Sequence, residues 1–440
     1  MDSKQSSPMK VLMLPWLAHG HITPFLELAK KLSTKNFHIY LCSTPINLTS
    51  IQNKITKTQS LSIELIPLHL PPSPELPPHL HTTNGLPPHL LRTLINTFEL
   101  ENPSFSHILE TICPDLVIYD LFRPRLPTTD ALEYKIPAVE LLTSGASVIC
   151  FGYHMFTKPD VEFPFPELLL NSNQRAPASD SGDRRKIERP KISCKMMLFN
   201  SFRELEGKYI DYLSILMEKK IIPTGPLVQE ITDGDEDQEI LQWLGTKDEL
   251  STVFVSFGSE CFLSKEEREE IAHGLEHSGV NFIWIVRFPA GERIEIKEAL
   301  PVEFLKRTGE RGMVVEGWAP QAQILAHSST GGFVSHCGWN SILESLKFGV
   351  PIIAMPMIHD QPVNAKFVKV AGFGVEVKRD ENGRLDRENI AEVIRKVVVD
   401  EKGVDVRMKA REFSEIMRKK GEEEIDGVVK ELVQLCTEGK

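Results

Sequence analysis

The chain has 440 residues, of which 41% are hydrophobic and 25% are charged, the balance of an ordinary globular protein. Its formal net charge of -11 argues against nucleic acid or an anionic membrane as the main partner, because both would repel it. The length is enough for two or three domains. Apolar runs in the first half predict strands, in chain order, at 10–15, 37–43, 61–68, 115–120, 137–143, 196–201 and 221–227.

Two further segments of this half have a local interpretation. Thr23 is a candidate N-cap and Pro24 a candidate first helical residue, directly ahead of the helical spacing of FLELAKKL. Residues 171–192 are polar, charged and without periodicity, which predicts a mobile surface loop.

The second half repeats the alternation of strands and helices. Its apolar runs predict strands at 251–259, 281–287, 312–318, 331–335 and 350–356, and the charged run 404–435 predicts one or two surface helices. Strands that are apolar on both faces and alternate with helices are typical of a parallel sheet covered on both sides. We therefore expect an α/β protein of two doubly wound domains facing across a cleft: an N-terminal domain at 1–227, an acidic linker at 228–239, a C-terminal domain at 240–415, and a final helix at 416–440 that can pack back on the first domain.

The cysteines and the apolar runs indicate the compartment. Seven cysteines are scattered without zinc spacing, and an odd count without a secretory signal favours reduced thiols in the cytoplasm. No segment reaches 18 consecutive apolar residues, so we expect no integral membrane segment. No clustered acidic pair suggests a divalent ion, and we predict no metal site.

Two polar groups stand where strands of the first half end, the place where α/β sheets bind ligands. His19 and His21 follow the first strand, and an imidazole can take a proton near neutral pH. The alternatives are a surface histidine or a capping contact, and a metal site is weak because no third ligand lies nearby. Asp120 ends the buried run LVIYD and can orient a histidine, or equally serve as a helix N-cap.

A third polar group surrounds residues 336–341. The turn between GGFVS and ILESLKF has amides and a positive helix end that would face a diphosphate, with the Gly258-Ser259 turn donating from the other side. Glu344 can accept from ribose hydroxyls, and Trp318 offers a flat face to a base. The alternative is one capped core helix. Neither a P-loop nor a G-x-G-x-x-G after a strand occurs.

These residues also show a family resemblance. The 44 positions from Trp318 to Gln361, with W-A-P-Q, H-C-G-W-N-S and the closing D-Q, resemble the signature box of the plant family 1 UDP-glycosyltransferases. PWLAHGHITPFLELAKKL and VFVSFGS resemble that family's N-terminal segment and second-domain opening. The resemblance implies the two-domain GT-B fold, in which the first domain binds the acceptor and the second the UDP-sugar.

The resemblance also implies residue roles. His21, directly before Ile-Thr-Pro, would be the general base with Asp120 as its partner, whereas His19 lies two residues early. For the donor, Trp318 would stack on uracil, Ala319 would offer its backbone, Gln321 would reach ribose or base, and Glu344 would hold the ribose. The diphosphate would contact Ser259, His336, Asn340 and Ser341, and the sugar would contact Trp339, Asp360 and Gln361.

The implied activity is an inverting, metal-independent transfer from UDP-glucose, the donor co-substrate, without a prosthetic group. Trp339 and the closing Gln361 are similar to enzymes that prefer UDP-glucose. GSECFLSKE and AHGHITPFLELAKKL resemble the branch-forming group, which adds sugar to an existing glycoside. We expect a triterpenoid glycoside acceptor of the mogroside type with a β-1,6 or β-1,2 link, and a monomeric enzyme. Candidate acceptor contacts by position are Leu17, Phe122, Arg123, Thr143, Ser144 and His359.

Two alternatives remain open from the sequence. One is an O-glucosyltransferase of the same donor chemistry that acts on flavonoid or terpenoid aglycones. The other is a non-catalytic sugar-nucleotide-binding protein on the same fold.

Overall fold

The computed structural model describes residues 7–100, 103–120, 136–170, 196–231, 238–289 and 294–438. The chain forms two compact units, which are described separately. The first unit comprises Met1–Phe156, Ser181–Val228 and Lys420–Lys440, and the second comprises Thr157–Asp180 and Gln229–Lys419. The loop predicted at 171–192 lies outside the described residues, and the predicted domain limits stay a prediction.

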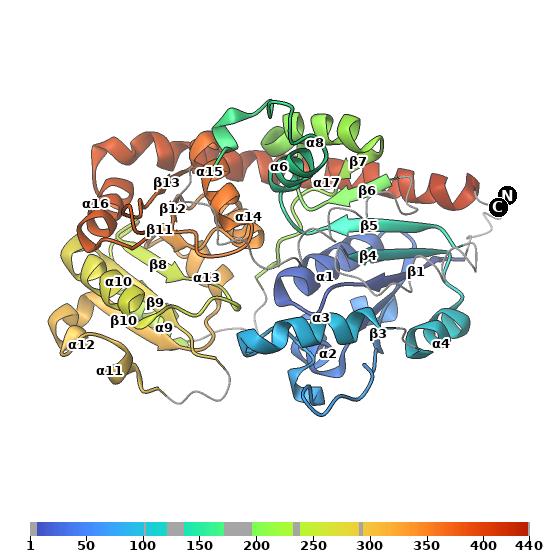
Figure 1. Cartoon of the computed structure of the whole chain (residues 1–440), viewed down its shortest axis with the longest axis horizontal. Coiled ribbons are helices and arrows are strands. Elements are labelled where there is room, and N and C mark those ends of the chain that lie inside the picture. The colour runs from blue at the N-terminus through green and yellow to red at the C-terminus, as the bar shows by residue number, and fades with distance from the viewer. Residues whose placement is uncertain are drawn as a thin grey trace. The chain divides into compact units, whose positions relative to one another are not determined.

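A parallel sheet forms the centre of the first unit (Figure 1). Its strand order is β3-β2-β1-β4-β5-β6-β7. The strands are β1 (Met9–Leu14), β2 (Phe37–Ser43), β3 (Ile63–Pro67), β4 (Leu116–Asp120), β5 (Ala138–Leu142), β6 (Met196–Phe199) and β7 (Lys220–Pro223). All seven strands predicted from the sequence are confirmed, most with ends shifted by one to four residues.

Helices cover both faces of this sheet because alternate strand residues point to opposite sides. Val11 and Met13 pack in a core with α1 and with the end of α17, whereas Leu12 and Leu14 pack in a second core with α3 and α4. The helices of the unit are α1 (His19–Ser33), α2 (Pro45–Ile51), α3 (Leu91–Glu99), α4 (Pro103–Ile112), α6 (Ala146–Thr157), α8 (Arg203–Met217) and the C-terminal part of α17 (Val404–Glu438).

The predicted start of the first helix is wrong. Helix α1 begins at His19 with Ala18 as N-cap, and Pro24 lies inside it. The amides of His21 and Ile22 both donate to the Ala18 carbonyl at 2.9 Å, so the turn before Thr23 is already helical. Pro24 has no amide hydrogen, and it lies inside the helix five residues after its start. His21 therefore sits on a helix rather than in a loop.

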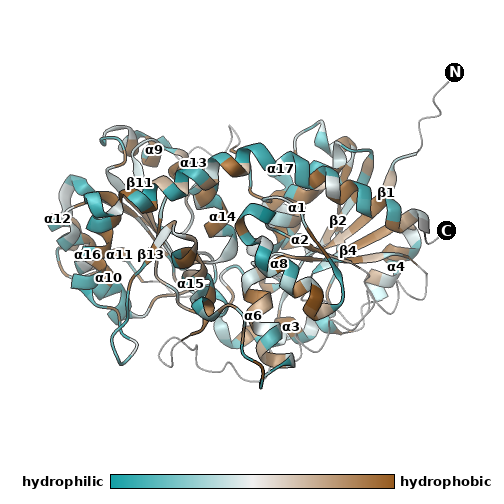
Figure 2. Ribbon diagram, turned by 90° about the horizontal axis from the view of Figure 1, so that it is seen from above, coloured by the Kyte–Doolittle hydropathy of each residue, from teal (hydrophilic) through white to brown (hydrophobic). Residues whose placement is uncertain are grey.

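A second parallel sheet forms the second unit, in the order β10-β9-β8-β11-β12-β13. Its strands are β8 (Thr252–Ser256), β9 (Asn281–Val286), β10 (Gly312–Glu316), β11 (Thr330–Ser335), β12 (Ile352–Ala354) and β13 (Gly374–Glu376). The first five confirm the prediction; β13 was missed. Two Rossmann-like sheets with helices on both faces confirm the predicted α/β fold, and the strands are brown along most of their length in Figure 2.

The second unit has the same two-sided packing. Val253 and Val255 pack in one core with residues of α10 and α16, and Phe254 packs in the other with α9 and α13. The helices are α9 (Gln238–Gly245), α10 (Lys265–Ser278), α11 (Ile296–Ala299), α12 (Phe304–Thr308), α13 (Gln321–Ala326), α14 (Trp339–Lys347), α15 (Gln361–Ala371), α16 (Arg387–Val398) and the start of α17.

Helix α17 is one continuous helix of 35 residues that belongs to both units. Its residues to Lys419 cluster with the second unit and those from Lys420 with the first. Ile425, Val428 and Leu432 are 0% exposed and belong to the core around α1. Burial of these side chains stabilises the first unit by about 1.5–3 kcal/mol each.

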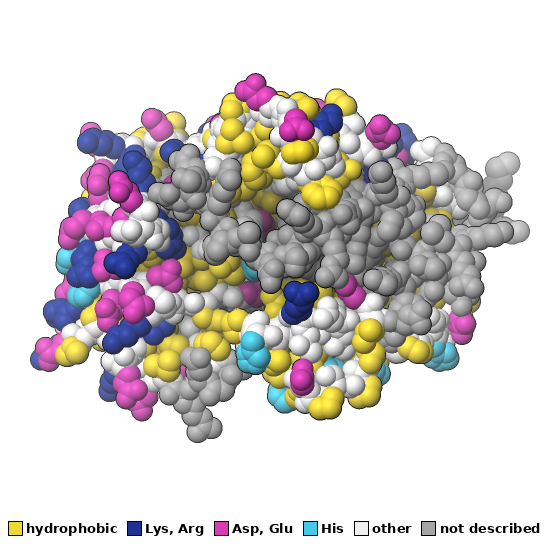
Figure 3. All heavy atoms as spheres, viewed as in Figure 1, with side chains coloured by type: hydrophobic (Ala, Val, Ile, Leu, Met, Phe, Trp, Pro, Cys, Tyr) yellow, Lys and Arg dark blue, Asp and Glu magenta, His cyan; other side chains and the backbone are white. Residues whose placement is uncertain are grey.

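Charges of both signs are interspersed on the face of the second unit that Figure 3 shows. Arg387 pairs with Glu270, and Arg307 pairs with Glu276 at 2.6 Å. On this face, charges of opposite sign therefore lie close enough to pair. Among the described helices, none has both the length and the apolar character needed to cross a membrane.

Candidate active site

The order of each sheet reverses at one point, and several predicted site residues follow the strands that meet there: His21, Asp120, Ser259 and His336. In the first unit, β1 and β4 are neighbours, with Leu14 paired to Tyr119, so the residues after both strands leave the sheet side by side. In the second unit, β8 and β11 are neighbours, with Ser256 paired to Ser335. Ligands of open α/β sheets bind at such reversal points, beyond the carboxyl ends of the strands.

His21 and Asp120 meet at the reversal point of the first unit. The imidazole Nδ1 of His21 lies 2.8 Å from Asp120 Oδ2, and their side chains are 21% and 0% exposed. The Trp16 amide donates to the same carboxylate oxygen at 3.2 Å, which fixes the carboxylate. Since a carboxylate only accepts, the hydrogen of a neutral imidazole lies on Nδ1 and the lone pair on Nε2. Nε2 is therefore the atom that can take a proton.

Thr143 is a third member of this group. Its Oγ1 lies 3.0 Å from His21 Nδ1, because β5 neighbours β4 and Thr143 follows directly after β5. Asp120 and Thr143 thus flank the same hydrogen and restrict rotation of the ring. The sequence predicted Thr143 only as an acceptor contact, and this contact with the imidazole was missed.

His336 packs against two glycines at the reversal point of the second unit. A Cβ on Gly258 would lie 2.8 Å from His336 Nε2, and one on Gly338 would lie 2.6 Å from the same atom. Both contacts are too short for any side chain, and Gly258 also has a φ of +76°, which favours glycine. The two turns therefore bring their backbones against the ring.

The amino end of α14 lies in the same turn. Gly338 is its N-cap and has no side chain to cap the first amides, whereas α10 satisfies its own with a capping box of Ser264 and Glu267. Asn340 and Ser341 lie in the first turn of α14 and are partly exposed. This helix end can hold an anion by amides, dipole and side chains together.

Burial lowers the pKa of His336 to about 4, while the backbone of Ser256 acts in the opposite direction. The native ring therefore stays neutral at a pH where an unfolded chain, with a pKa of ~6.5, is protonated. Because the unfolded state binds the proton first, the free energy of unfolding should fall as pH drops from about 6.5 to about 4.

Between neutral pH and pH 4.5, the free energy of unfolding should fall by about 1–3 kcal/mol less in His336→Gln than in the wild type. The measurement is denaturant unfolding of the wild type and the variant at pH 7 and at pH 4.5. His89→Gln, at an exposed histidine, is the matched control. An unchanged pH slope in His336→Gln would contradict a native ring held neutral.

Trp318, Gln321 and Glu344 form a second group in this unit. Gln321 begins α13 and its Nε2 donates to Glu344 Oε2, with Ser341 Oγ at 3.5 Å. Trp318 is 60% exposed, an unusual state for so large an apolar ring, while Ala319 is 7% exposed. An exposed indole suits a base, and a carboxylate paired with an amide suits the hydroxyls of a ribose.

Asp360 and Gln361 stand at the start of α15. Gln361 Oε1 accepts from the amides of Met357 and Ile358 at 3.0 and 2.8 Å, so its NH₂ group is the end left for a ligand. Asn364 is 0% exposed and its Nδ2 donates to Cys337 O at 3.0 Å and to Asp360 Oδ2 at 3.1 Å. Asn364 therefore links the 336–341 turn to Asp360.

The other residues predicted to contact a ligand differ in how far they are exposed. Trp339 is 4% exposed with its ring 5.7 Å from that of Phe367, so only its edge or backbone can meet a ligand. Leu17 is 0% exposed and belongs to the core. The partly exposed or exposed positions are Ser144, Ser259 and His359. Phe122 and Arg123 lie outside the described residues.

Sequence reasoning missed Asn364 and Arg287. Asn364 stands four residues after Asp360 on α15, a helical spacing that could have suggested a contact. Arg287 directly follows the apolar strand β9, the same strand-end position that drew attention to Asp120. Within the described residues, no group of three or more His, Cys, Asp or Glu side chains could hold a metal ion.

Comparison with known proteins identifies close relatives. A family model described as "UDP-glucoronosyl and UDP-glucosyl transferase" matches residues 228–422. A mogroside IIIx synthase of Siraitia grosvenorii is 54% identical, over 98% of this chain and 94% of the relative. A beta-D-glucosyl crocetin beta-1,6-glucosyltransferase of Gardenia jasminoides is 51% identical, over 97% and 99%. The crystal structure of Glycyrrhiza uralensis UGT73P12, complexed with glycyrrhetinic acid 3-O-monoglucuronide, is similar at a TM-score of 0.85, with 26% identity over 98% and 97% of the chains.

Proposed function

The chain belongs to the UDP-glycosyltransferase family and has its GT-B fold, and from this premise we propose that it adds glucose from UDP-glucose to a sugar hydroxyl of a glycosylated triterpenoid or similar small molecule. The family uses a UDP-sugar donor and a small-molecule acceptor. The choice of a glycoside acceptor is supported by the names of two relatives, a mogroside IIIx synthase and a glucosyl crocetin glucosyltransferase. A β-1,6 or β-1,2 linkage and a monomeric enzyme remain part of the proposal.

The observation that supports catalysis most strongly is the pairing of His21 with Asp120. In the proposed reaction, His21 Nε2 takes the proton of the acceptor hydroxyl while its oxygen forms a bond to the anomeric carbon. The bond from that carbon to the UDP oxygen breaks, and UDP leaves with the electron pair. Attack from the face opposite UDP inverts the configuration from α to β. The buried Asp120 carboxylate stabilises the imidazolium that forms.

The second unit provides the groups proposed to bind the donor. Trp318 would stack on uracil, while Gln321 and Glu344, already in contact, would hold the ribose. The amides at the amino end of α14, with Ser259, His336, Asn340 and Ser341, would receive the charge that develops on the leaving diphosphate. Asp360 and the NH₂ group of Gln361 would contact the glucose.

The proposed function is tested by a mass-spectrometric screen of the purified protein with UDP-glucose. Triterpenoid and crocetin monoglucosides are compared with their free aglycones, and the linkage of each product is determined. We expect a second hexose on the monoglucosides. Turnover of the aglycones alone would support aglycone-directed transfer instead, and UDP binding by calorimetry without any product would support a non-catalytic binder.

Asn364→Ala should raise the KM for UDP-glucose about 5–50-fold, because both the 336–341 turn and Asp360 lose a hydrogen bond of about 1–2 kcal/mol. Steady-state kinetics at saturating acceptor measure this. Asn281→Ala is the control, since Asn281 Nδ2 also donates to a side chain, Ser251 Oγ at 3.1 Å, but at the amino end of β9. A folded Asn364→Ala protein with the wild-type KM would show that neither bond positions the donor.

A further inference from the structure

Arg287 leaves the second sheet next to Trp318. Strands β9 and β10 are paired with Val286 opposite Glu316, and the Gly317 amide continues the ladder by donating to Val286 O at 2.9 Å. Gly317 has a φ of +85°, a conformation that favours glycine, and turns the chain directly before Trp318. The residues that follow the two strands are therefore held side by side.

Two contacts fix the Arg287 side chain against this turn. Its Nε donates to the Gly317 carbonyl at 2.8 Å, and its Cζ lies over the Trp318 ring, 5.1 Å from the centroid. A planar guanidinium can stack on an indole while it donates in its own plane, which an ammonium cannot do. One face of Trp318 is thus covered, although the side chain as a whole remains 60% exposed.

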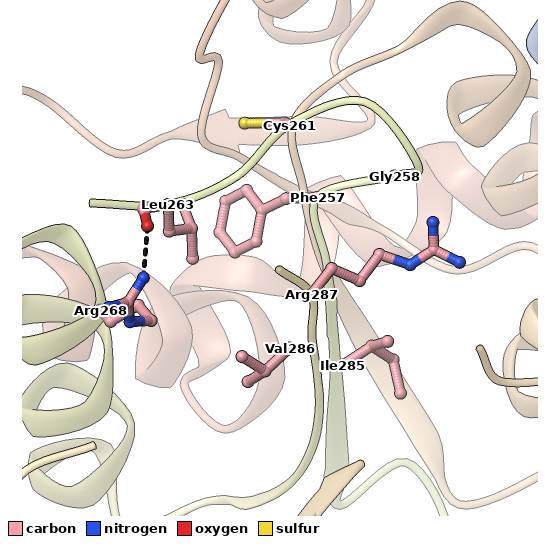
Figure 4. A pocket seen from close by; sticks show the side chains of 8 residues that line it. All are labelled: Phe257, Gly258, Cys261, Leu263, Arg268, Ile285, Val286 and Arg287. Carbon is pink, nitrogen blue, oxygen red and sulfur yellow. Dashed lines mark hydrogen bonds between the residues drawn. The ribbon is translucent and has the colours of Figure 1, made fainter. Parts of the chain in front are cut away.

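Arg287 also lines the pocket that Figure 4 shows. Its apolar lining is Phe257, Cys261, Leu263, Ile285 and Val286, and it also includes Gly258, Arg268 and Arg287. The guanidinium of Arg287 extends away from that of Arg268, on the side where the Gly258 turn lies. Burial lowers the pKa of Arg287, but a guanidinium remains charged at any physiological pH.

We propose that Arg287 is a positioning residue for the donor base: its guanidinium holds the Trp318 indole in the orientation that offers the opposite face to uracil. This rests on the proposed donor site. An exposed indole without such support would lose rotamer freedom on binding the base, and that cost would weaken binding. Since Arg287 does not touch the reacting atoms in this assignment, it should affect donor affinity and leave the chemical step unchanged.

The test compares Arg287→Met and Arg287→Lys with Arg268→Met. Arg268 is a matched control, because it lines the same pocket, donates to two backbone carbonyls, and lies over Phe288 instead of Trp318. Calorimetry gives the Kd of UDP and of inorganic pyrophosphate, steady-state kinetics give kcat and the KM for UDP-glucose, and thermal unfolding checks the fold.

We expect Arg287→Met to raise the Kd of UDP and the KM for UDP-glucose about 3–30-fold, with kcat within about twofold and pyrophosphate affinity unchanged. Arg287→Lys should recover only part of the affinity, and Arg268→Met should bind UDP as the wild type does. Should Arg287→Met fail to fold, Arg287→Lys decides by the same criteria. In a Trp318→Leu background, the Arg287 substitution should add less than about twofold.

Two results would overturn the assignment: wild-type UDP affinity in the Arg287 variants, or an equal loss for pyrophosphate, which would make Arg287 a phosphate contact. A different result would show that the proposed donor site is itself wrong. In that case Trp318→Leu alone would leave the UDP affinity unchanged.

Discussion

Replacing His21 by alanine should lower kcat about 10²–10⁴-fold, the usual loss when a positioned general base is removed. An acceptor hydroxyl is a weak nucleophile, and His21 Nε2 is the atom that the bond to Asp120 leaves as proton acceptor. All residues proposed to bind the donor belong to the second unit. The Kd of UDP-glucose should therefore stay within about twofold of the wild-type value. Single-turnover kinetics and calorimetry measure the two quantities separately.

His19→Ala is the control for this prediction. His19 and His21 both lie in the first turn of α1, but the imidazole that reaches Asp120 is that of His21. His19→Ala should keep its rate within about threefold. If His19→Ala loses the activity and His21→Ala keeps it, the base has been assigned to the wrong histidine. Equal loss of UDP-glucose binding in His21→Ala would point to a structural role.

The central strands were predictable because burial on both faces makes them continuous apolar runs, as in β4 and β8. Strand β13 escaped because three residues, Gly374–Glu376, are too short to show a pattern. The start of α1 was misplaced because Thr23-Pro24 resembles a cap and first residue, although the chain is already helical at His19. There the bonds to Ala18 O outweighed the local preference.

The candidate site, too, could be predicted from the sequence only in part. Residues at strand ends, such as Asp120 and His336, could be found from the sequence because the topology of a parallel sheet places its carboxyl ends together. The contacts of Thr143 with His21 and of Asn364 with Cys337 join positions 122 and 27 residues apart. No periodicity of a single segment reports such a contact, since it depends on strand order and loop conformation.

Asp120→Asn should lower kcat about 10²–10³-fold, the second largest effect expected. The asparagine side chain has the same shape and can still accept from the Trp16 amide, so the fold should persist. An amide oxygen in the place of Oδ2 is neutral, so the variant lacks the charge that stabilises the imidazolium. The loss should therefore appear in kcat, with the KM for UDP-glucose little changed.

Asp115→Asn is the matched control, since Asp115 precedes the same strand and its carboxylate also accepts a backbone amide, that of Lys10, at 3.1 Å. It should keep its rate within about threefold. Because His21 and Asp120 are proposed to act as a unit, the double variant of His21→Ala and Asp120→Asn should be no slower than His21→Ala alone. Fully additive losses would mean that Asp120 acts on the reaction independently of His21. A wild-type rate in Asp120→Asn would mean that the ring needs no charge beside it.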